Sequence, residues 1–460
     1  MRRYLVALFT LSIVPALVGA PVPAAAAAPA KPGRIVSVTA RPGPGVGEVS
    51  LSWRQDGKNT TGYVLETALT MFSKTDRSMA SSGRRARITR IAPHRRSITL
   101  SAARVRSLGA GVASGNGLFF RFYAVNAKSS GTATRAYPYL RTVVPRAPAP
   151  KAKGTRFRVA SFNVRTARAT QDSRSWLQRS SAVARQVVSR RVGIAALQEL
   201  SPGRADGRTG STAGTQRQTN SLLSSLARVG GKRYKLTRTT SYVTPGRPGS
   251  TQGTRILYDS SRYRLLSGCV DTTGGRAHSA SCSMMLPLMP GQQEKDRVRA
   301  AIAQFQDRGT GQRFWFASVH LNSSHSSNAA QEGRYNAHRK AQARAVAVRI
   351  ASYNRQRLPV VIAGDFNSWQ NNRVGNSPHD HLVELGYYDT SSAVKRVNFG
   401  YTTYNAFKVT VPVSKQAIGV RLDMIMVKGA RGASYYENVM RVTDRQRPSD
   451  HNMILSDIVL

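Results

Sequence analysis

The C-terminal part of the chain contains a series of short apolar segments that each end in a polar side chain, and this series is the feature that most constrains the fold. Segments such as RFRVASFNV, RFWFASVHLN and LPVVIAGDFN have the length and the β-branched and aromatic content of buried strands. Two longer segments, residues 174–191 and 329–357, have the amphipathic periodicity of helices. Alternating strands and helices predict α/β layering.

The side chains at the ends of these strands come from a narrow set of residue types, namely acids, amides and histidine. They are Asn163, Glu199, His320, Asn322, Asp365, Asn367, Asp423, Asp450 and His451. Each one alone is explained by a turn or by a strand end that faces solvent. Because a desolvated, unpaired charge beside a buried strand is costly, so many of them in one region indicate a shared site. The Ser-Asp-His triplet at 449–451 is therefore expected to be half of an active site.

The order of these segments carries a family resemblance. SFNV, LQEL, SVHLN, GDFNS, RLDMIMV and SDH follow one another from residue 156 to residue 460. This region resembles the endonuclease/exonuclease/phosphatase superfamily, whose members include deoxyribonuclease I, exonuclease III and neutral sphingomyelinases. The resemblance implies an α/β four-layer sandwich, in which two packed β-sheets are flanked by helices, and it implies hydrolysis of phosphate esters.

The same resemblance implies a metal site. Glu199 would hold a divalent metal, with Asn163 and Asp450 nearby. Carboxylate and amide oxygens suit Mg²⁺ or Mn²⁺, with Ca²⁺ as a further candidate, because these hard cations prefer oxygen ligands.

The resemblance also implies the acid–base groups. Asp365 and Asn367 would orient the attacking water and the scissile phosphate, and His320 would flank that phosphate as a proton carrier. His451, paired with Asp423, would be the second proton carrier, since a carboxylate partner fixes the imidazole tautomer and raises its pKa.

Two further residues, Asn322 and Arg255, are assigned to substrate contact. Arg255 stands in a stretch that offers no acid to pair with His320, so the partner of His320 is left open. Histidine at position 320 is typical of the deoxyribonuclease and sphingomyelinase branches and disfavours a repair role. The remaining histidines, including His379 and His381, are assigned to surface or loop positions.

The N-terminal part of the chain reads as a separate module. The Pro/Ala/Lys-rich segment 146–155 is typical of a linker. Before it, short alternating segments separated by Gly, Ser and Asn predict an all-β sandwich over residues 34–145. With Trp53 on one strand, Tyr63 on the next and the stretch FRFYAVNAKSSGTA, this module resembles fibronectin type III. No catalytic set is visible in it.

The first 28 residues read as a signal peptide, because Arg2 and Arg3 precede an apolar run that is too short to span a membrane and an Ala-rich cleavage region follows. The mature chain is therefore expected to be secreted, with association with the cell wall as an option and no stable membrane insertion. Cys269 and Cys282 flank a Gly-Gly pair and predict one disulfide. Two separate buried thiols are the alternative.

The charge points to a polyanionic partner. Lys and Arg number 69 against 22 Asp and Glu, which gives a net charge of +47. Such a field attracts nucleic acid, anionic membrane or acidic wall polymers. The leading hypothesis is a secreted, sequence-nonspecific nuclease acting on DNA, with RNA also considered. A sphingomyelinase-like phospholipid phosphodiesterase and a non-catalytic adhesin that binds acidic wall polymer through the basic sandwich are the alternatives. A monomer is assumed.

Overall fold

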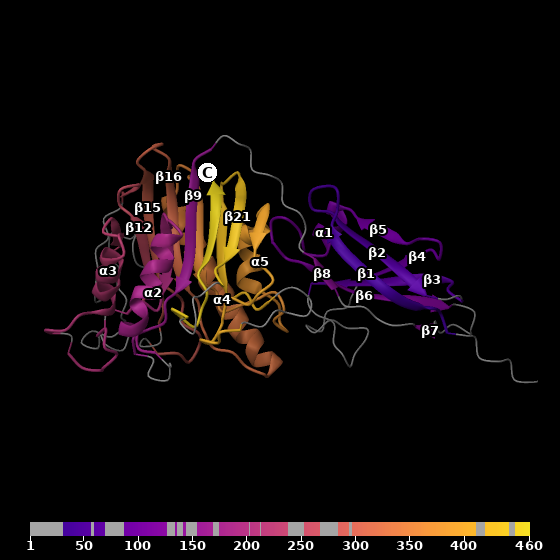
Figure 1. Ribbon diagram of the computed structural model, residues 1–460, viewed down its shortest axis with the longest axis horizontal. Coiled ribbons are helices and arrows are strands. Elements are labelled where there is room, and N and C mark those ends of the chain that lie inside the picture. Colours follow the sequence, from indigo (N-terminus) through magenta and orange to yellow (C-terminus); the bar gives the residue numbers. More distant parts are fainter. Residues whose placement is uncertain are drawn as a thin grey trace, which may run out of the picture.

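The computed structural model describes residues 31–56, 59–69, 87–126, 134–135, 141–143, 154–168, 174–201, 203–211, 213–237, 253–266, 284–293, 297–410, 419–440 and 447–460. The predicted signal peptide, both cysteines and most of the predicted linker lie outside these residues. The described residues form two bodies of β-sheet, the N-terminal module (34–143) and the C-terminal domain (154–460), which lie side by side (Figure 1).

The N-terminal module consists of two packed sheets. Its elements are β1 (Arg34–Pro42), β2 (Val49–Asp56), β3 (Gly62–Ala68), β4 (Arg87–Ile91), β5 (Ser97–Leu100), α1 (Ala102–Ser107), β6 (Leu118–Asn126), β7 (Thr134–Arg135) and β8 (Arg141–Val143). One sheet has the order β1-β2-β5, and the other has β4-β3-β6-β7 with β8 on β6. Trp53, Tyr63 and Phe122 pack against one another in the core between them, with the ring centroids of Trp53 and Phe122 4.6 Å apart. A β-sandwich is therefore present, and its likeness to fibronectin type III stays a prediction.

The C-terminal domain contains two seven-stranded sheets, β11-β12-β10-β9-β22-β21-β19 and a sheet with the path β13-β15-β16-β17-β20-β18, to which β14 adds through β15. The strands are β9 (Arg156–Asn163), β10 (Ile194–Gln198), β11 (Tyr234–Leu236), β12 (Arg255–Asp259), β13 (Tyr263–Leu265), β14 (Met284–Met285), β15 (Arg299–Asp307), β16 (Arg313–His320), β17 (Val360–Asp365), β18 (Tyr388–Asp389), β19 (Lys395–Val397), β20 (Asp423–Lys428), β21 (Gly432–Asn438) and β22 (Ile454–Val459). The helices are α2 (Trp176–Ser189), α3 (Gln218–Arg228), α4 (Ala329–Tyr353), α5 (Ser377–Glu384) and the 3-10 turn η3 (Thr390–Ser392).

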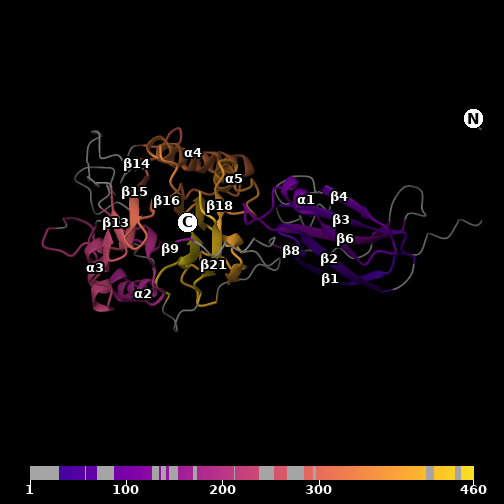
Figure 2. The same ribbon diagram turned by 90° about the horizontal axis from the view of Figure 1, so that it is seen from above.

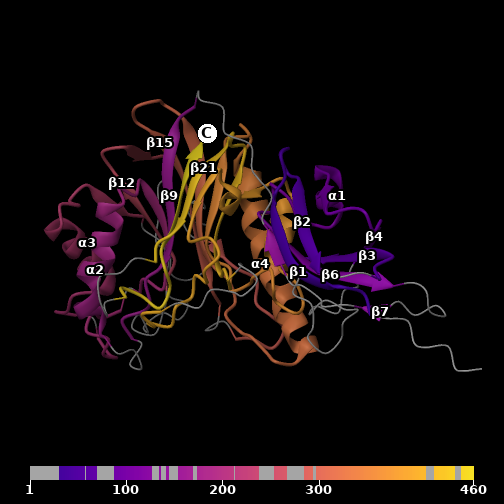
Figure 3. The ribbon, with the colours of Figure 1, turned by 45° about the vertical axis from the view of Figure 1, so that its right-hand side comes forward.

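These elements form four layers. Seen from above and from the side, α2 and α3 cover the outer face of one sheet, and α4 and α5 cover the outer face of the other (Figures 2 and 3). Three hydrophobic cores match the three spaces between layers. Most apolar side chains of the central core come from the facing sides of the two sheets. The predicted layering of two sheets between helices is confirmed.

Alternation along each strand decides which side chains reach the space between the sheets. On β9, Phe157 and Val159 enter the central core, whereas Ala160 and Phe162 face the helices. On β17, Val361 and Ala363 enter the central core and Val360 and Ile362 face α4. Because side chains alternate with a period of two, the polar residues that end these strands, Asn163 and Asp365, point into the same space between the sheets.

None of the helices in the described ranges is both long enough and apolar enough to cross a lipid bilayer.

Candidate active site

Three polar residues lie side by side at one end of the second sheet. The register of β16 and β17 places His320 opposite Asp365, and the register of β17 and β20 places Asp365 opposite Asp423. All three side chains continue the inward-facing positions of their strands. The sequence separates these residues widely, and the parallel and antiparallel pairing of three strands brings them into one row.

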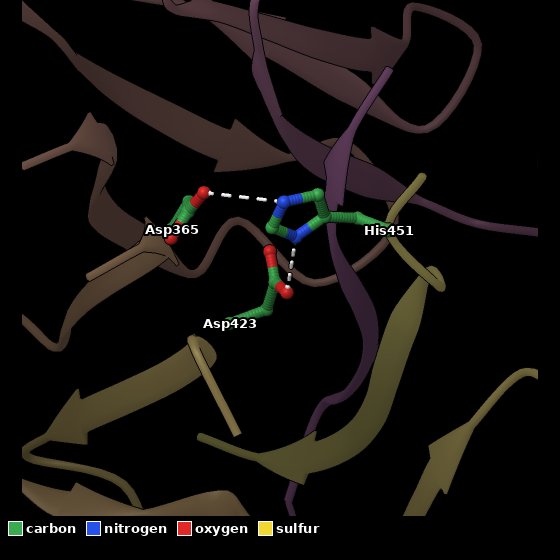
Figure 4. Close-up of side chains that lie close together, drawn as sticks. All are labelled: Asp365, Asp423 and His451. Carbon is green, nitrogen blue, oxygen red and sulfur yellow. Dashed lines mark hydrogen bonds and ion pairs between the residues drawn. The ribbon is translucent and has the colours of Figure 1, made fainter. Parts of the chain in front are cut away.

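His451 completes this row from the first sheet. Its Nδ1 lies 2.9 Å from Asp423 Oδ2, within hydrogen-bond distance, and its Nε2 lies 3.7 Å from Asp365 Oδ2 (Figure 4). Burial opposes protonation of this imidazole, but the charges of Asp423 and Asp365 outweigh that cost and raise the pKa of His451 to about 10. His451 Nδ1 therefore donates to Asp423, and the tautomer and ring orientation are fixed.

His320 faces the same carboxylate. Its Nε2 lies 3.6 Å from Asp365 Oδ2, so two imidazole nitrogens approach one carboxylate oxygen. The side chain of His320 is 13% exposed, compared with 6% for His451. The acid that faces His320 in the described part of the chain is thus Asp365, which answers the question that the sequence around Arg255 left open.

Asn163, Glu199 and Asp450 lie beside this group. The amide of Asn163 donates to Glu199 Oε1 at 3.1 Å and to Asp365 Oδ2 at 3.2 Å, so it joins the two groups of acids. Arg165 Nη1 lies 3.8 Å from Glu199 Oε2 and 3.5 Å from Asp450 Oδ2. The two carboxylates therefore converge on one positive group from different loops.

Three residues of the site have an unusual backbone conformation. Arg165, Glu199 and Asn367, which follow β9, β10 and β17, have φ values of 58°, 57° and 47°. Residues other than glycine adopt this left-handed region rarely, at a cost on the order of 1–3 kcal/mol each. The left-handed conformation turns the chain sharply after each strand. The polar side chains therefore stay at the end of the space between the two sheets.

The metal site has a suitable donor set. Glu199 and Asp450 offer carboxylate oxygens, the donors that hard divalent cations prefer. Asn163 Oδ1 accepts from the backbone N–H of Arg165 at 3.1 Å, and the amide nitrogen of Asn163 donates to Glu199 and Asp365. The side chain of Asn163 therefore links two acids of the site. A second group, Asp365, Asp423 and His451, has its ligand atoms within 4.8 Å of one another and could also hold a metal.

The remaining predicted residues lie at the edge of the site. Asn367 donates its backbone N–H to Asp365 Oδ1 at 2.9 Å, but its side chain donates to Leu321 O. Asn322 Oδ1 accepts from the N–H of Ser324, which shapes the loop after β16. Arg255 lies opposite Leu197 on β10, just before the Glu199 turn, and its guanidinium donates to Thr254 O at 2.9 Å.

Arg179 is a supporting residue that the sequence alone did not indicate. This fully buried guanidinium on α2 donates to the carbonyls of Val164, Arg165, Thr166 and Pro448, and so joins the loop after β9 to the loop before β22. Ser449 adds a hydrogen bond of 2.6 Å to Asn163 O. A signal was available for Arg179, because an arginine occupies a position of the otherwise apolar stripe of α2.

Tyr404 was also missed. Its ring meets the His451 ring edge-on at 5.1 Å, and the residue is 43% exposed.

The assignment of His379 to a surface or loop position was wrong. His379 lies on α5 and is completely buried, where it contacts Asp380, Asp389 and the carbonyl of Ser114.

A model of the Endonuclease/Exonuclease/phosphatase family matches residues 160–451. The chain belongs to this family. As a family member it is a phosphoric ester hydrolase, and enzymes of this family generally depend on a divalent metal. No curated protein matches the chain in sequence.

Comparison with solved structures finds several similar chains. An endonuclease/exonuclease/phosphatase from Bacteroides vulgatus is 18% identical with a TM-score of 0.49, and the match covers 66% of this chain and 99% of that one. A mannosyl-6-phosphatase from Bacteroides thetaiotaomicron is 17% identical with a TM-score of 0.47, covering 66% and 100%. The human Nocturnin catalytic domain is 16% identical with a TM-score of 0.44, covering 66% and 93%.

Proposed function

We propose that this chain is a secreted, divalent-metal-dependent phosphodiesterase that cleaves nucleic acid without sequence preference, with DNA as the first substrate to test and RNA as the second. The observation that carries this proposal is the arrangement around Asp365. One of its oxygens faces Asn163, His320 and His451, and Asp423 holds His451 from behind. Two imidazoles that flank one buried carboxylate suit a reaction in which one group takes a proton from water and another protonates a leaving oxygen.

The residues have the following roles in this proposal. Glu199, to which Asn163 donates, and Asp450 would hold Mg²⁺ or Mn²⁺. The bound ion would offset the negative charge that develops on the phosphate oxygens. Asp365 orients the attacking water together with Asn367, and His320 and His451 exchange protons beside the phosphate. Asp423 keeps Nδ1 of His451 protonated, so that Nε2 faces the substrate. Asn322 and Arg255 contact the substrate at the edge of the site.

The charge of the chain supports a polyanionic substrate. The net charge is +47, and the loop before α3 carries Arg204, Arg208 and Arg217. Of these, Arg204 is paired with Asp206 through a contact of 2.5 Å. Cationic side chains that follow a phosphate backbone bind it without reading bases, which favours a nonspecific nuclease. A second basic, Gly-rich loop of the sequence, residues 244–255, lies largely outside the described residues.

The phospholipid alternative has less support. Its sequence basis was the apolar stretch from Ser283 to Pro290, which would have to be exposed in order to enter a membrane surface. Within the described part of this stretch, Met284 and Leu286 are buried in the core between α4 and its sheet, while Met285 is 42% exposed. The adhesin alternative also has less support, because binding an acidic polymer through charge needs none of the site's buried carboxylates.

The test is a cleavage assay on supercoiled plasmid with the purified mature chain and Mg²⁺ or Mn²⁺. We expect nicking followed by smearing, loss of activity with EDTA, and a fall of roughly 10²- to 10⁴-fold in His451→Ala. His94→Ala removes an exposed histidine of the N-terminal module and is the matched control. Intact plasmid with every metal would overturn the nuclease proposal, and sphingomyelin would then be the next substrate.

Secretion and assembly are tested separately. N-terminal sequencing of protein from the culture medium should find a chain that begins after the predicted signal peptide, and light scattering should give the mass of a monomer. Binding of the isolated wall polymer by the full mature chain, lost at high salt, would support wall contact through the basic module.

A further inference from the structure

The N-terminal module is joined to the C-terminal domain by buried polar contacts. The loop between α1 and β6, residues 108–117, lies against the side of the domain that carries α5 and β18 (Figures 1 and 2). The N–H of Asp389 donates to Ala113 O at 2.8 Å, and Nε2 of His379 lies 2.9 Å from Ser114 O. Gly115 has φ +61°, and a Cβ added there would meet Ser391 Oγ at 2.5 Å. These are close contacts between specific atoms of the two bodies.

Gln370 makes the most demanding of these contacts. Its Nε2 donates to Gly117 O and to Leu69 O, both at 2.7 Å, and its Oε1 accepts from Gly117 N at 3.2 Å. The residue is 7% exposed, and every one of these bonds goes to the backbone of the module. A buried amide that lost these partners would be left with unsatisfied donors and an unsatisfied acceptor, which is unfavourable. The conformation of Gln370 therefore depends on the module.

Gln370 belongs to the loop that carries the candidate site. This loop leaves β17 at Asp365, turns at Asn367, where φ is +47°, and continues to α5. Asn367 donates its backbone N–H to Asp365 and its side-chain amide to Leu321 O at 3.0 Å. A shift of Gln370 would thus be transmitted along a short, strained segment to the two residues that face the phosphate in the proposed reaction.

The opposite side of this loop is held by α4. Ser368 Oγ lies 3.3 Å from Asn336 Oδ1, and Asn372 donates to Glu332 Oε1 at 2.8 Å. Glu332 is itself fixed by Arg339 at 2.5 Å, and both are buried. The loop is therefore clamped between α4 on one side and the N-terminal module on the other.

We infer that the N-terminal module is a positioning element of the active site, and that Gln370 is the positioning residue through which the module fixes residues 366–372. The inference rests on the proposed function for its kinetic readout. It assigns the module a role beyond that of a tethered spacer or adhesion unit, because a spacer needs no buried bonds to the loop that follows Asp365.

The kinetic test uses the full mature chain with two variants that disturb the interface between module and domain from opposite sides. Gln370→Ala removes the contact from the loop, and Gly115→Ala introduces a Cβ against Ser391 from the module. Both should lower kcat about tenfold or more while KM changes less than threefold, because misplacement of catalytic groups by about 1 Å costs up to ~10²-fold in rate. Gln356→Ala, an exposed glutamine beyond α4, is the matched control and should keep wild-type values.

The substrate arm separates positioning from substrate binding. Supercoiled plasmid and the small diester bis(p-nitrophenyl) phosphate should lose rate to a similar extent, since a displaced loop affects the chemistry of any phosphodiester. Loss on plasmid alone would overturn the inference, because it would mean that the module only binds the polymer.

Hydrogen exchange gives a readout that does not need activity. In both variants the amides of residues 366–372 should exchange faster by tenfold or more than in wild type, while β9 and β16 stay protected. If wild type cleaves neither substrate but the amides of residues 366–372 still exchange faster in both variants, the proposed function is wrong, and positioning of the loop by the module is supported. If kcat and exchange of 366–372 are unchanged in both variants, the module does not position the loop.

Discussion

Two buried ion pairs, one in each body of the molecule, show how differently the same kind of contact can be used. In the module, Glu66 accepts from Arg121 at 2.5 Å and from the hydroxyl of Tyr123 at 2.8 Å. In the domain, Asp423 pairs with His451 at 2.9 Å, and His451 also faces Asp365. Both pairs are almost fully buried. The cation of the first pair cannot release its proton, whereas the cation of the second pair can.

This difference separates a structural network from a chemical one. An arginine whose partner is removed remains charged while it is buried away from water, so the loss of the partner lowers the stability of the fold. A histidine whose partner is removed can become neutral, so folding loses only the stabilisation that the raised pKa represents, and proton transfer is impaired. In the proposed reaction, the domain therefore uses a cation that can release its proton, His451, whereas the module uses a permanently charged cation, Arg121, in a purely structural contact.

The largest expected effect is on hydrolysis, in Asp423→Asn. The substitution removes the charge that holds His451 protonated at Nδ1, so plasmid cleavage should fall about 10³-fold. The free energy of unfolding should fall by less than when the carboxylate of the Glu66–Arg121 pair is removed, because His451 can release its proton once Asp423 is neutralised whereas Arg121 cannot. Initial cleavage rates and urea titrations measure the two quantities. A variant that is strongly destabilised but as active per folded molecule as wild type would contradict the distinction between the two pairs.

The corresponding substitution in the ion pair of the module is Glu66→Gln. It leaves Arg121 charged and buried without its carboxylate, so the module should lose on the order of 3–5 kcal/mol of stability. Below the temperature at which the module unfolds, kcat should equal that of wild type. Glu48→Gln is the matched control, because the Glu48 side chain is half-buried and accepts from the N–H of Gly45 at 2.9 Å. If the control destabilised the module as much as Glu66→Gln, burial of the pair would not be the cause.

Metal binding should also distinguish the two bodies. A metal that binds only the folded site at 100 times its Kd adds about 2.7 kcal/mol of stability. Hydrogen exchange should therefore slow in β9 and β17 when Mg²⁺ or Mn²⁺ is added, with little change in β3 of the module. Glu199→Gln should remove the slowing, and Glu384→Gln, at an exposed carboxyl on α5, should not. Equal slowing in Glu199→Gln would place the metal elsewhere, with the Asp365, Asp423 and His451 group as the next candidate.

Some features of the fold could be predicted from the sequence, and others could not. The strand-end residues were visible because polar groups next to apolar runs stand out, and the amphipathic pattern located α2 and α4 to within a few residues. Strand β15 was missed because its inward positions include the small residues Ala301 and Ala303, which give a weak apolar signal. Helix α3 was missed because it starts at Gln218, directly after a Gly- and Arg-rich loop, without a side-chain cap.

Contacts between distant segments could not be predicted from local patterns. Gln370 and His379 are ordinary polar residues in sequence, and their partners in the module lie more than 250 positions away. The left-handed turns at Arg165 and Glu199 are likewise imposed by the packing of the two sheets, since neither residue type favours that conformation. The strand ends could be predicted, but not the contacts that fix them in place.

The smallest expected effect concerns the contact between the two bodies and its dependence on pH. His379 faces Asp380, Asp389 and Ser114 O, and Asp389 is also paired with Arg421 at 3.3 Å. Burial opposes the charge of His379, but the hydrogen bonds to Asp380 and Asp389 outweigh it and raise its pKa to about 9. A histidine with a raised pKa stabilises the fold fully below its unfolded value near 6.5, and this contribution is lost as pH rises through 9.

Wild type should therefore lose about 2 kcal/mol between pH 7 and pH 9 relative to His379→Gln, as measured by urea titration. His338, whose pKa is lowered by burial, titrates below this window, so His338→Gln should follow the wild-type curve. Parallel curves for wild type and His379→Gln would show that the imidazole holds the two bodies together without its charge.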